Sequence, residues 1–416
     1  MVKLILMNDH PINVAVIGAG ASGLLAAIAA ARQGASVTLF ERNASLGRKL
    51  LVTGSGRCNL SNDHVASERY TCADPNWMDT CLSRFGVSEL LKTLNAIGVP
   101  VYKTWDGWYY PLSNSAHSIV DALSHAIKAA GVHTQTSSQV LDIAQHQKGF
   151  RVSYFHNANQ HDQVFDRVIV SSGGKAYPSL GSKGEMFPVL DKLGHTVLPI
   201  HPALAPVLVE LDSLKSLQGV RLDLGVSLLK GKTVIAAAAG NMIFTEWGLN
   251  GPAVMDISHH IPDPPGDEIT LSLNLLHFIE TEFSNILEEK RQTEFPVSLL
   301  LAAFFPPKAV QCYTNLLALP VNTPLNKLDD PSISRLMDQL KKTNLKVLGV
   351  RGYKYCQASV GGVPVSEVSP ETLESTILPG LYLTGETLDV VGPCGGFNLH
   401  FAFASGALAG KAAGST

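Results

Sequence analysis

Asn13-Val14-Ala15-Val16-Ile17-Gly18-Ala19-Gly20-Ala21-Ser22-Gly23 is the stretch that decides the fold of this chain. Residues 13–17 are a short, largely apolar and β-branched run, which predicts a buried strand, and the glycines end it abruptly. The segment Leu24–Arg32 is rich in Ala and Leu and predicts a helix, with Gly34 where a C-cap glycine is expected. Because a second strand is predicted at Ser36–Phe40, residues 13–40 are predicted to form one βαβ unit.

The three glycines have separate roles in a dinucleotide-binding turn. Gly18 permits the turn, Gly20 lets the backbone approach a diphosphate, and Gly23 lets the helix pack closely on the strand. The free N–H groups and the positive dipole end of the helix then stabilise phosphate charge without a lysine. Glu41 ends the second strand, where a carboxylate can accept hydrogen bonds from ribose hydroxyls. An ordinary glycine-rich turn between two elements would leave Glu41 unexplained.

The next segment predicts a loop. Leu46–Lys49 and Thr53–Asn59 contain three basic residues and three glycines with little helical or strand period. In a dinucleotide-binding protein such a loop can cover the diphosphate and the flavin edge, with Arg and Lys offsetting the phosphate charge. A solvated surface loop is the alternative, and the apolar run Leu50–Val52 beside the glycines argues against it.

Two further segments predict strands of the same sheet. Arg167–Ser171 is an apolar strand ending in Ser172-Gly173-Gly174, and Gly380–Thr384 is another, ending in Gly385-Glu386. The loop Gly392–Asn398 then opens an Ala-rich helix, which gives a second strand-turn-helix crossing. Two crossings at opposite ends of the chain imply one nucleotide-binding domain whose halves are separated by an insertion.

The predicted fold is α/β, with a Rossmann-type FAD-binding domain that is split in sequence. Its first part is predicted at 1–194 and its second at 353–416. The inserted substrate domain, 195–352, has no second GxGxxG motif. Alternating apolar and polar residues predict a β-barrel-like region at 195–275, and helix-forming composition predicts a small helical region at 276–345.

Composition excludes several classes of protein. The chain has 416 residues, 45% of them hydrophobic and 16% charged, which indicates buried cores and argues against long disordered tracts. Its net charge of −3 provides no general field for nucleic acid, so no nucleic-acid partner is expected. Asp9-His10-Pro11 interrupt the first apolar run, and no apolar stretch reaches the ~20 residues of a membrane span, so we expect a cytoplasmic protein without a signal peptide. Six scattered cysteines without CxxC spacing predict no metal site.

Several motifs together resemble the BaiN-like family of bacterial FAD-dependent oxidoreductases, which includes enzymes named aminoacetone oxidases. They are GAGASG (18–23), GRKLLVTGSGRCNLSN (47–62) and LYLTGETLDVVGPCGGFNLHFAFASG (381–406). The similarity extends to 244–253 and 358–363, so it covers nearly the whole chain. This resemblance implies FAD as the cofactor.

The resemblance also implies roles for individual residues. Glu41 would hold the adenosine ribose, Val140 would bracket the adenine, Gly385-Glu386 would face the ribityl-diphosphate region, and Gly395–Asn398 would present N–H groups to the isoalloxazine ring. Glu246-Trp247 departs from the family pattern, in which a histidine is expected, and this departure affects the substrate pocket more than the FAD site. The residues predicted to bind the cofactor are Gly18, Gly20, Ala21, Ser22, Gly23, Glu41, Arg42, Arg48, Lys49, Gly54, Ser55, Gly56, Arg57, Cys58, Asn59, Val140, Ser172, Gly173, Gly174, Gly385, Glu386, Gly395, Gly396, Phe397 and Asn398.

The predicted function is an FAD-dependent oxidoreductase acting on a small organic substrate. Cys58 has no partner cysteine nearby, which argues against a dithiol relay, so electrons would be exchanged with oxygen or with transiently bound NAD(P)H. A flavin-dependent RNA-modifying enzyme and a non-enzymatic flavin redox sensor are the alternatives. The sequence assigns no catalytic residue or oligomeric state. Cys394 is favoured as a turn residue over a reactive thiol, and His400 as a packing residue over a proton relay.

Overall fold

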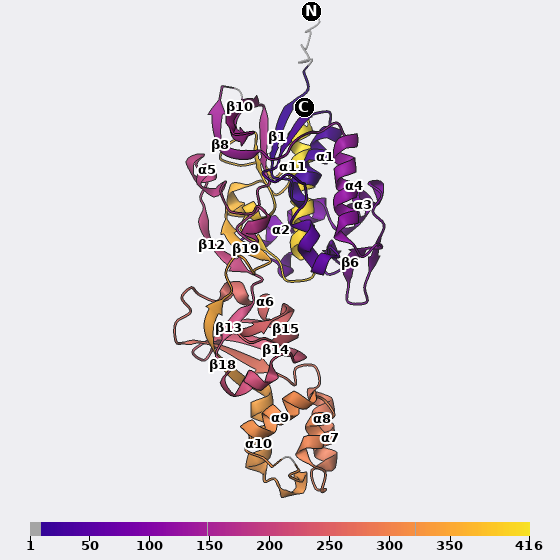
Figure 1. Ribbon diagram of the computed structural model, residues 1–416, viewed down its shortest axis with the longest axis vertical. Helices are drawn as coiled ribbons and strands as arrows, with labels where there is room; N and C mark the ends of the chain where they lie inside the picture. The colour runs from indigo at the N-terminus through magenta and orange to yellow at the C-terminus, as the bar shows by residue number, and fades with distance from the viewer. Residues whose placement is uncertain (1–9, 148, 321) are drawn as a thin grey trace, which may run out of the picture. The chain divides into compact units, whose positions relative to one another are not determined.

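A computed structural model describes residues 10–147, 149–320 and 322–416 of the chain (Figure 1). The chain divides into two compact units, of which unit 1 is Met1–His201 with Ala358–Thr416 and unit 2 is Pro202–Gln357. These boundaries lie a few residues beyond the predicted ones at 194/195 and 352/353. The strand leading out of unit 1, β12 (Leu198–Ala203), pairs with the strand leading back, β19 (Ala358–Gly362), and this pairing keeps most of both strands in unit 1.

Unit 1 is built on a parallel five-stranded sheet. Its order is β20 (Leu381–Leu383), β11 (Arg167–Val170), β1 (Asn13–Ile17), β2 (Ser36–Phe40) and β7 (His133–Gln135). The central strand β1 pairs with both β11 and β2, so that Val14 lies opposite Arg167 and Val37. Most of the residues in the central strands are fully buried, as expected for a parallel sheet covered on both faces. The sheet therefore joins segments from both ends of the chain, and the predicted split α/β fold is confirmed.

Two helices pack closely on each other beside this sheet. They are α1 (Ala21–Arg32) and α11 (Phe397–Gly414), which lie side by side in Figure 1. A Cβ added to Gly410 would lie 2.2 Å from the carbonyl oxygen of Ala26, and Gly406 and Gly414 meet α1 in the same way. Small residues at four-residue spacing let two helix backbones approach this closely. The apolar character of α11 serves this packing, and within 10–147, 149–320 and 322–416 no helix is both long and apolar enough to cross a membrane.

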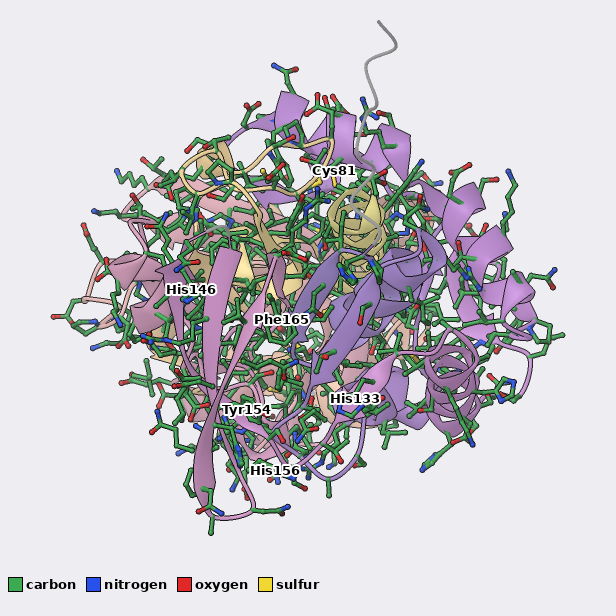
Figure 2. All side chains as sticks on the ribbon, turned by 90° about the horizontal axis from the view of Figure 1, so that it is seen from above. Cys81, His133, His146, Tyr154, His156 and Phe165 are labelled. Atoms are coloured by element: carbon green, nitrogen blue, oxygen red, sulfur yellow. The ribbon has the colours of Figure 1, made fainter. Side chains whose placement is uncertain are left out.

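Smaller sheets and helices complete unit 1. A three-stranded antiparallel sheet places Tyr154 and Phe165, labelled in Figure 2, beside Phe40 of β2, with ring centroids 4.9 and 5.9 Å from that of Phe40. The remaining strands are β3 (Ser61–Asn62), β4 (Thr71–Cys72), β5 (Val101–Lys103), β6 (Trp108–Pro111), β8 (Gln139–His146), β9 (Gly149–His156), β10 (Asn159–Phe165) and β21 (Val390–Val391). The remaining helices are α2 (Pro75–Arg84), α3 (Val87–Ala96), α4 (Ala116–Ala129) and α5 (Phe187–Lys192), and the short 3₁₀ turns include η1 (Leu50–Gly56), η3 (Pro178–Leu180) and η8 (Gly385–Thr387).

Unit 2 contains a closed six-stranded barrel, which confirms the predicted β-barrel-like region. Its strands, in order around the barrel, are β13 (Val207–Val209), β16 (Gly248–Asn250), β15 (Thr233–Phe244), β14 (Arg221–Lys230), β17 (Ile269–Asn274) and β18 (Thr343–Val350). Its helices are α6 (Pro252–Met255), α7 (Glu280–Lys290), α8 (Val297–Ala302), α9 (Pro307–Leu316) and α10 (Asp330–Lys341). The predicted helical region ran to residue 345, whereas β18 begins at Thr343, because Thr343, Leu345 and Val347 alternate with exposed residues and turn inward to close the barrel.

Candidate functional site

The glycine turn after β1 is open on one side and tightly packed on the others. Gly18 has a φ of +99°, and a Cβ there would lie 2.5 Å from the carbonyl oxygen of Ser171. A Cβ on Gly23 would lie 1.8 Å from the carbonyl oxygen of Gly18. By contrast, apart from the atoms of Gly20 and of its neighbours along the chain, no atom of the described residues lies within 4 Å of the position a Cβ on Gly20 would take. Gly18 and Gly23 are thus required by the protein's own packing, whereas Gly20 borders open space that a ligand can approach.

The start of α1 is suited to an anion. Gly20 is its N-cap and has no side chain with which to satisfy the first N–H groups, and the first turn, from Ala21 onward, contains no acidic residue. The first N–H groups of a helix lack partners within the helix, and the helix dipole is positive at this end. A phosphate group at this position would satisfy both features.

Glu41 lies at the end of β2 and is buried beside this turn. Its Oε2 atom accepts a hydrogen bond from the N–H of Ala19 at 2.9 Å, which places the carboxylate at the glycine turn. Its Oε1 atom accepts from the backbone N–H and the side-chain amide of Asn43, at 2.8 and 2.6 Å. Sequence reasoning missed Asn43. Arg42, predicted to bind the cofactor, has its guanidinium paired with the carboxylate of Glu185.

The predicted loop at 46–59 is ordered by short 3₁₀ turns, η1, rather than being irregular throughout. The ammonium group of Lys49 pairs with Oε1 of Glu386 at 2.5 Å, which joins this loop to the C-terminal end of the chain. The guanidinium of Arg57 lies 4.4 Å from the ring centroid of Tyr110 and donates a hydrogen bond to its hydroxyl at 3.3 Å. The loop therefore brings two predicted basic residues to defined positions.

Cys58 is buried within the same loop and adopts a positive φ of +62°. Its backbone N–H donates to the carbonyl oxygen of Thr53 at 3.0 Å, which closes the turn. Burial raises the pKa of its thiol to about 11, so the thiol is protonated at neutral pH. A protonated, buried thiol is a poor nucleophile.

Two glycine-rich turns follow the strands β11 and β20 at the carboxyl edge of the sheet. The hydroxyls of Ser171 and Thr384 hydrogen-bond at 2.7 Å and hold these turns together. Gly173 has a φ of +72°, and a Cβ on Gly174 would lie 1.9 Å from the hydroxyl oxygen of Ser359. Open α/β sheets bind ligands at this edge, and the contact of Ser172–Gly174 with the cofactor stays a prediction.

Glu386 presents a buried carboxylate oxygen at the same edge. Oε1 pairs with Lys49, but Oε2 has no hydrogen-bond partner among the described residues. The preceding residue, Gly385, has a φ of +59° and donates its N–H to the hydroxyl of Ser405 at 3.0 Å. A buried carboxylate oxygen without a partner is costly, and a ligand hydroxyl that donated to it would remove the cost.

The loop before α11 presents backbone rather than side chains. Gly395 and Gly396 have φ values of +112° and +98°, which other residues adopt only with strain. The side chain of Asn398 accepts from the N–H of Gly392 at 2.9 Å and donates to its carbonyl oxygen at 2.7 Å, so this side chain closes the loop. Phe397 is buried against Tyr70, with ring centroids 6.0 Å apart. The side chains of these two predicted residues therefore shape the loop, and the carbonyl oxygen of Gly395 accepts a hydrogen bond from the side chain of Asn62 at 2.9 Å.

His400 is fully buried one turn into α11. Its Nδ1 atom lies 2.9 Å from the hydroxyl oxygen of Ser61, which ties α11 to β3. Burial lowers the pKa of His400 to about 4, so the ring is neutral at pH 7. This agrees with the favoured packing role.

Val140, the least specific of the predicted contacts, lies near the start of β8 and is buried. Ser138, two residues earlier, donates its N–H to the carbonyl oxygen of Glu41 at 2.9 Å. This hydrogen bond brings the start of β8 to the end of β2. Val140 thus lies in the same part of unit 1 as the carboxylate predicted to hold the adenosine ribose.

In unit 2, Glu246 is exposed and Trp247 is half-buried between β15 and β16. The guanidinium of Arg351 lies 4.5 Å from the ring centroid of Trp247 and 3.4 Å from that of Tyr355. Arg351 therefore contacts two aromatic rings within unit 2. A role for Glu246 or Trp247 toward a substrate stays a prediction.

The residues of unit 1 fit the predicted FAD. The open space at Gly20 and the uncapped start of α1 suit its diphosphate. The buried Glu41 at the end of β2 suits its ribose. The partnerless Oε2 of Glu386 suits a hydroxyl donor. These features lie along one edge of one sheet, where a dinucleotide could contact all of them.

Comparison with known proteins identifies a matching family and several similar proteins. Residues 12–412 match the family described as the HI0933-like protein Rossmann domain. The chain is 35% identical over 408 residues to a 3-dehydro-bile acid delta(4,6)-reductase from Clostridium scindens, a match that covers 96% of this chain and 98% of that enzyme. It is 30% identical over 397 residues to a ribosomal RNA dihydrouridine synthase from Escherichia coli, with 94% and 95% covered. These matches confirm the resemblance inferred from the motifs.

Among solved structures, the chain resembles a 3-ketosteroid delta1-dehydrogenase from Sterolibacterium denitrificans. The TM-score is 0.51 at 11% identity, and the match covers 95% of this chain and 98% of that one. At this identity the likeness concerns the fold alone. The expectation that the chain has no nucleic-acid partner stays a prediction, because one of the relatives is named for ribosomal RNA.

Proposed function

The chain belongs to the HI0933-like Rossmann-domain family, and from that premise we propose that it reduces a carbon–carbon double bond conjugated to a carbonyl group. It is an FAD-dependent oxidoreductase, and the proposal adds the bond on which it acts. The observation that carries the proposal is that one chemistry underlies the names of two differently named relatives.

The two names describe the same change in different molecules. A 3-dehydro bile acid with Δ4,6 unsaturation has its double bonds in conjugation with the 3-oxo group. Uridine becomes dihydrouridine when the C5–C6 double bond, conjugated with the C4 carbonyl, is reduced. In each case a hydride adds to the carbon remote from the carbonyl, a proton adds to the adjacent carbon, and the substrate gains two electrons. The carbonyl makes the double bond electrophilic enough to accept a hydride.

FAD, when bound, would supply the hydride. The backbone at Gly20 and the start of α1 would hold its diphosphate, and Glu41 would orient the adenosine ribose. The Lys49–Glu386 pair would place the carboxylate Oε2 toward the ribityl chain. The backbone of Gly395-Gly396 would face the ring system. For the reduction to turn over, an electron donor is required, and we propose NADH or NADPH that binds transiently.

The first candidate substrate is a small cyclic enone. Support comes from the bile-acid reductase, which has the higher identity of the two relatives and matches over nearly its full length. The second candidate is a uridine in ribosomal RNA. It is favoured by the E. coli relative and by a Haemophilus influenzae enzyme of the same name, which is 27% identical over 401 residues.

The test is anaerobic reoxidation of the reduced enzyme. FAD-loaded protein is reduced with dithionite in stoichiometric amount and mixed with a 3-oxo-4,6-diene steroid, with a saturated 3-oxo steroid, or with unmodified ribosomal RNA. We expect the oxidised flavin spectrum to return with the dienone and not with the saturated ketone. Reduced product is identified by mass spectrometry as a gain of two hydrogens.

The outcomes separate the candidates. Reoxidation by ribosomal RNA, with dihydrouridine in the digested product, assigns the second substrate and leaves the proposed bond chemistry in place. Reoxidation by neither the dienone nor the RNA overturns the proposal. A parallel mixing of oxidised enzyme with NADH and with NADPH identifies the donor by bleaching of the flavin.

A further inference from the structure

Asn43 is the centre of a hydrogen-bond network that connects three segments of unit 1. Its backbone N–H and side-chain amide donate to Oε1 of Glu41 at 2.8 and 2.6 Å. Its side-chain oxygen accepts from the guanidinium of Arg48 at 2.7 Å. The same amide nitrogen donates to the carbonyl oxygen of Leu180, 137 residues away in sequence, at 3.1 Å. One short side chain thus contacts an acid, a base and a distant turn.

The chemistry of this position requires an amide. Glu41 offers only acceptors and Arg48 offers only donors, so the group between them must donate on one side and accept on the other. An aspartate would keep the bond to Arg48 but would place a second carboxylate against Glu41. An alanine would lose all three side-chain hydrogen bonds, to Glu41, Leu180 and Arg48. Asparagine therefore holds the two predicted cofactor contacts, Glu41 and Arg48, in one fixed arrangement.

Residues 180–185, which are distant in sequence, contact the segment at Arg42 and Asn43. The turn η3 ends at Leu180, and a Cβ on the next residue, Gly181, would lie 2.7 Å from the side-chain nitrogen of Asn43. Arg42 reinforces the contact, because its guanidinium pairs with Glu185 and lies 3.4 Å from the carbonyl oxygen of Gly181. Residues 180–185 are therefore fastened to the segment that follows β2 at two adjacent positions.

We propose that Asn43 is a positioning residue for the adenosine and diphosphate half of FAD. It orients Glu41 toward the ribose and Arg48 toward the diphosphate before the cofactor arrives, so that little side-chain entropy is lost on binding. This inference rests on the proposed FAD binding by unit 1. Asn43 does not touch the reacting atoms in this scheme and acts through Glu41 and Arg48.

Unit 2 offers a matched control. The side-chain oxygen of Asn241 accepts from the guanidinium of Arg221 at 2.7 Å, and its nitrogen donates to the carboxylate of Asp223 at 2.9 Å. The same arginine–amide–carboxylate arrangement thus occurs on the barrel of the other unit. The substitutions Asn43→Asp and Asn241→Asp make the same chemical change in the two networks.

The experiment titrates FAD into FAD-free protein and follows the quenching of flavin fluorescence. At about pH 8, we expect Asn43→Asp and Asn43→Ala to weaken FAD binding by about 10- to 100-fold, the loss of hydrogen bonds to a charged group. Asn241→Asp should stay within about twofold of the unchanged protein. Competition by ADP should weaken in parallel with FAD binding, because the predicted contacts are to the ADP half.

A pH series distinguishes positioning from general damage. In Asn43→Asp the new carboxylate faces Glu41 and Arg48, with the Arg42–Glu185 pair on the adjoining segment. Two carboxylates in contact raise the pKa of one of them, so the pair takes up a proton as the pH falls to about 6 and a donor to Glu41 is restored. FAD affinity of Asn43→Asp should therefore recover toward that of the unchanged protein, and that of Asn43→Ala should not.

Failure of this inference can be told apart from failure of the proposed function. If the unchanged protein binds no FAD, the proposed function fails. If it binds FAD but both Asn43 variants bind it equally well, the positioning role is overturned. If FAD-free Asn43→Asp melts at a clearly lower temperature than the unchanged protein, and its FAD affinity does not recover at lower pH, Asn43 is only structural. If FAD-free Asn43→Asp melts at the same temperature as the unchanged protein, and its FAD affinity is lost at pH 8 but recovers at lower pH, the positioning role of Asn43 is established.

Discussion

The α1–α11 helix pair of unit 1 and the loop that follows the barrel of unit 2 differ in how closely their glycines are packed, and one ion pair of each unit differs in exposure. In unit 1, a Cβ on Gly410 would lie 2.2 Å from a backbone oxygen, whereas in unit 2 no described atom lies within 4 Å of a Cβ built on Gly352. The Lys49–Glu386 pair of unit 1 is 24% and 18% exposed, and the Lys230–Glu268 pair of unit 2 is 59% and 57% exposed. Close backbone packing also occurs in the barrel, where a Cβ on Gly248 would lie 2.3 Å from the carbonyl oxygen of Val207, so the contrast concerns these two glycines and these two ion pairs.

The largest expected effect is that of Gly410→Ala. The new methyl group would meet the carbonyl oxygen of Ala26, so α11 must move away from α1. We expect a loss of about 3 kcal/mol in the free energy of unfolding, measured by urea denaturation. Gly352→Ala is the matched control and should change it by less than about 0.5 kcal/mol. Equal effects of the two substitutions would break the contrast between these two positions.

How much of each unit could be predicted from sequence follows from the same contrast. The bounds of β1 and β2 agree with the predicted strands, because local apolar runs ended by glycine or by a charged residue define them. For unit 2, the sequence predicted a β-barrel-like region and a helical region, but not the order of the strands around the barrel. The barrel is closed by β18, which follows the helices, so its pairing with β13 and β17 could not be read from any local pattern.

The candidate site shows the same limit. The glycine turn and Glu41 were predicted because their chemistry is encoded in adjacent residues. Asn43 was missed because no sequence motif indicates that its side chain would bond Glu41, Arg48 and Leu180 together, and Leu180 is 137 residues away. Arg42 was predicted to contact the cofactor, but its partner Glu185 lies on that same distant segment. Arg42 and Asn43 thus both contact residues 180–185, and the local sequence does not indicate these contacts.

The second prediction concerns the buried histidines. Burial lowers the pKa of His400 in unit 1, and of His259 in unit 2, to about 4 from the ordinary 6.5. The unfolded chain therefore takes up these protons first as the pH falls, so stability is fully present above about pH 6.5 and declines toward pH 4. Each histidine would account for up to about 3 kcal/mol across this window.

Comparing His400→Asn with the unchanged protein distinguishes the contribution of unit 1 to the pH dependence from that of unit 2. His400→Asn should flatten the pH dependence of unfolding in part, and the histidine contribution that remains should come from His259 and His260 of unit 2, whose pKa values burial also lowers. Unfolding in urea at several pH values, followed by circular dichroism, provides the slope. If His400→Asn leaves the dependence of the unfolding free energy on pH unchanged, His400 does not contribute to it. The pH dependence would then not distinguish unit 1 from unit 2.

The third prediction compares the two ion pairs. Lys49→Met leaves both oxygens of the partly buried Glu386 without a partner, and we expect a loss of about 2 kcal/mol in the FAD-free protein. Lys230→Met removes an exposed pair and should cost no more than about 0.5 kcal/mol. Added salt should weaken the Lys230 effect further and leave most of the Lys49 effect. If Lys230→Met proves the more costly, charge burial does not distinguish the units.

The smallest expected effect belongs to the aromatic cluster of unit 2. Tyr355 is 41% exposed, and its ring centroid lies 3.4 Å from the guanidinium of Arg351, which also contacts Trp247. Because Trp247 remains when Tyr355→Ala removes one ring, the loss should be about 1 kcal/mol in urea unfolding. Tyr355→Phe keeps the ring and should behave like the unchanged protein. A loss above about 2 kcal/mol for Tyr355→Ala would show that this cluster, like the backbone contacts of unit 1, is a principal source of stability, because an exposed cation–π contact alone cannot supply so much.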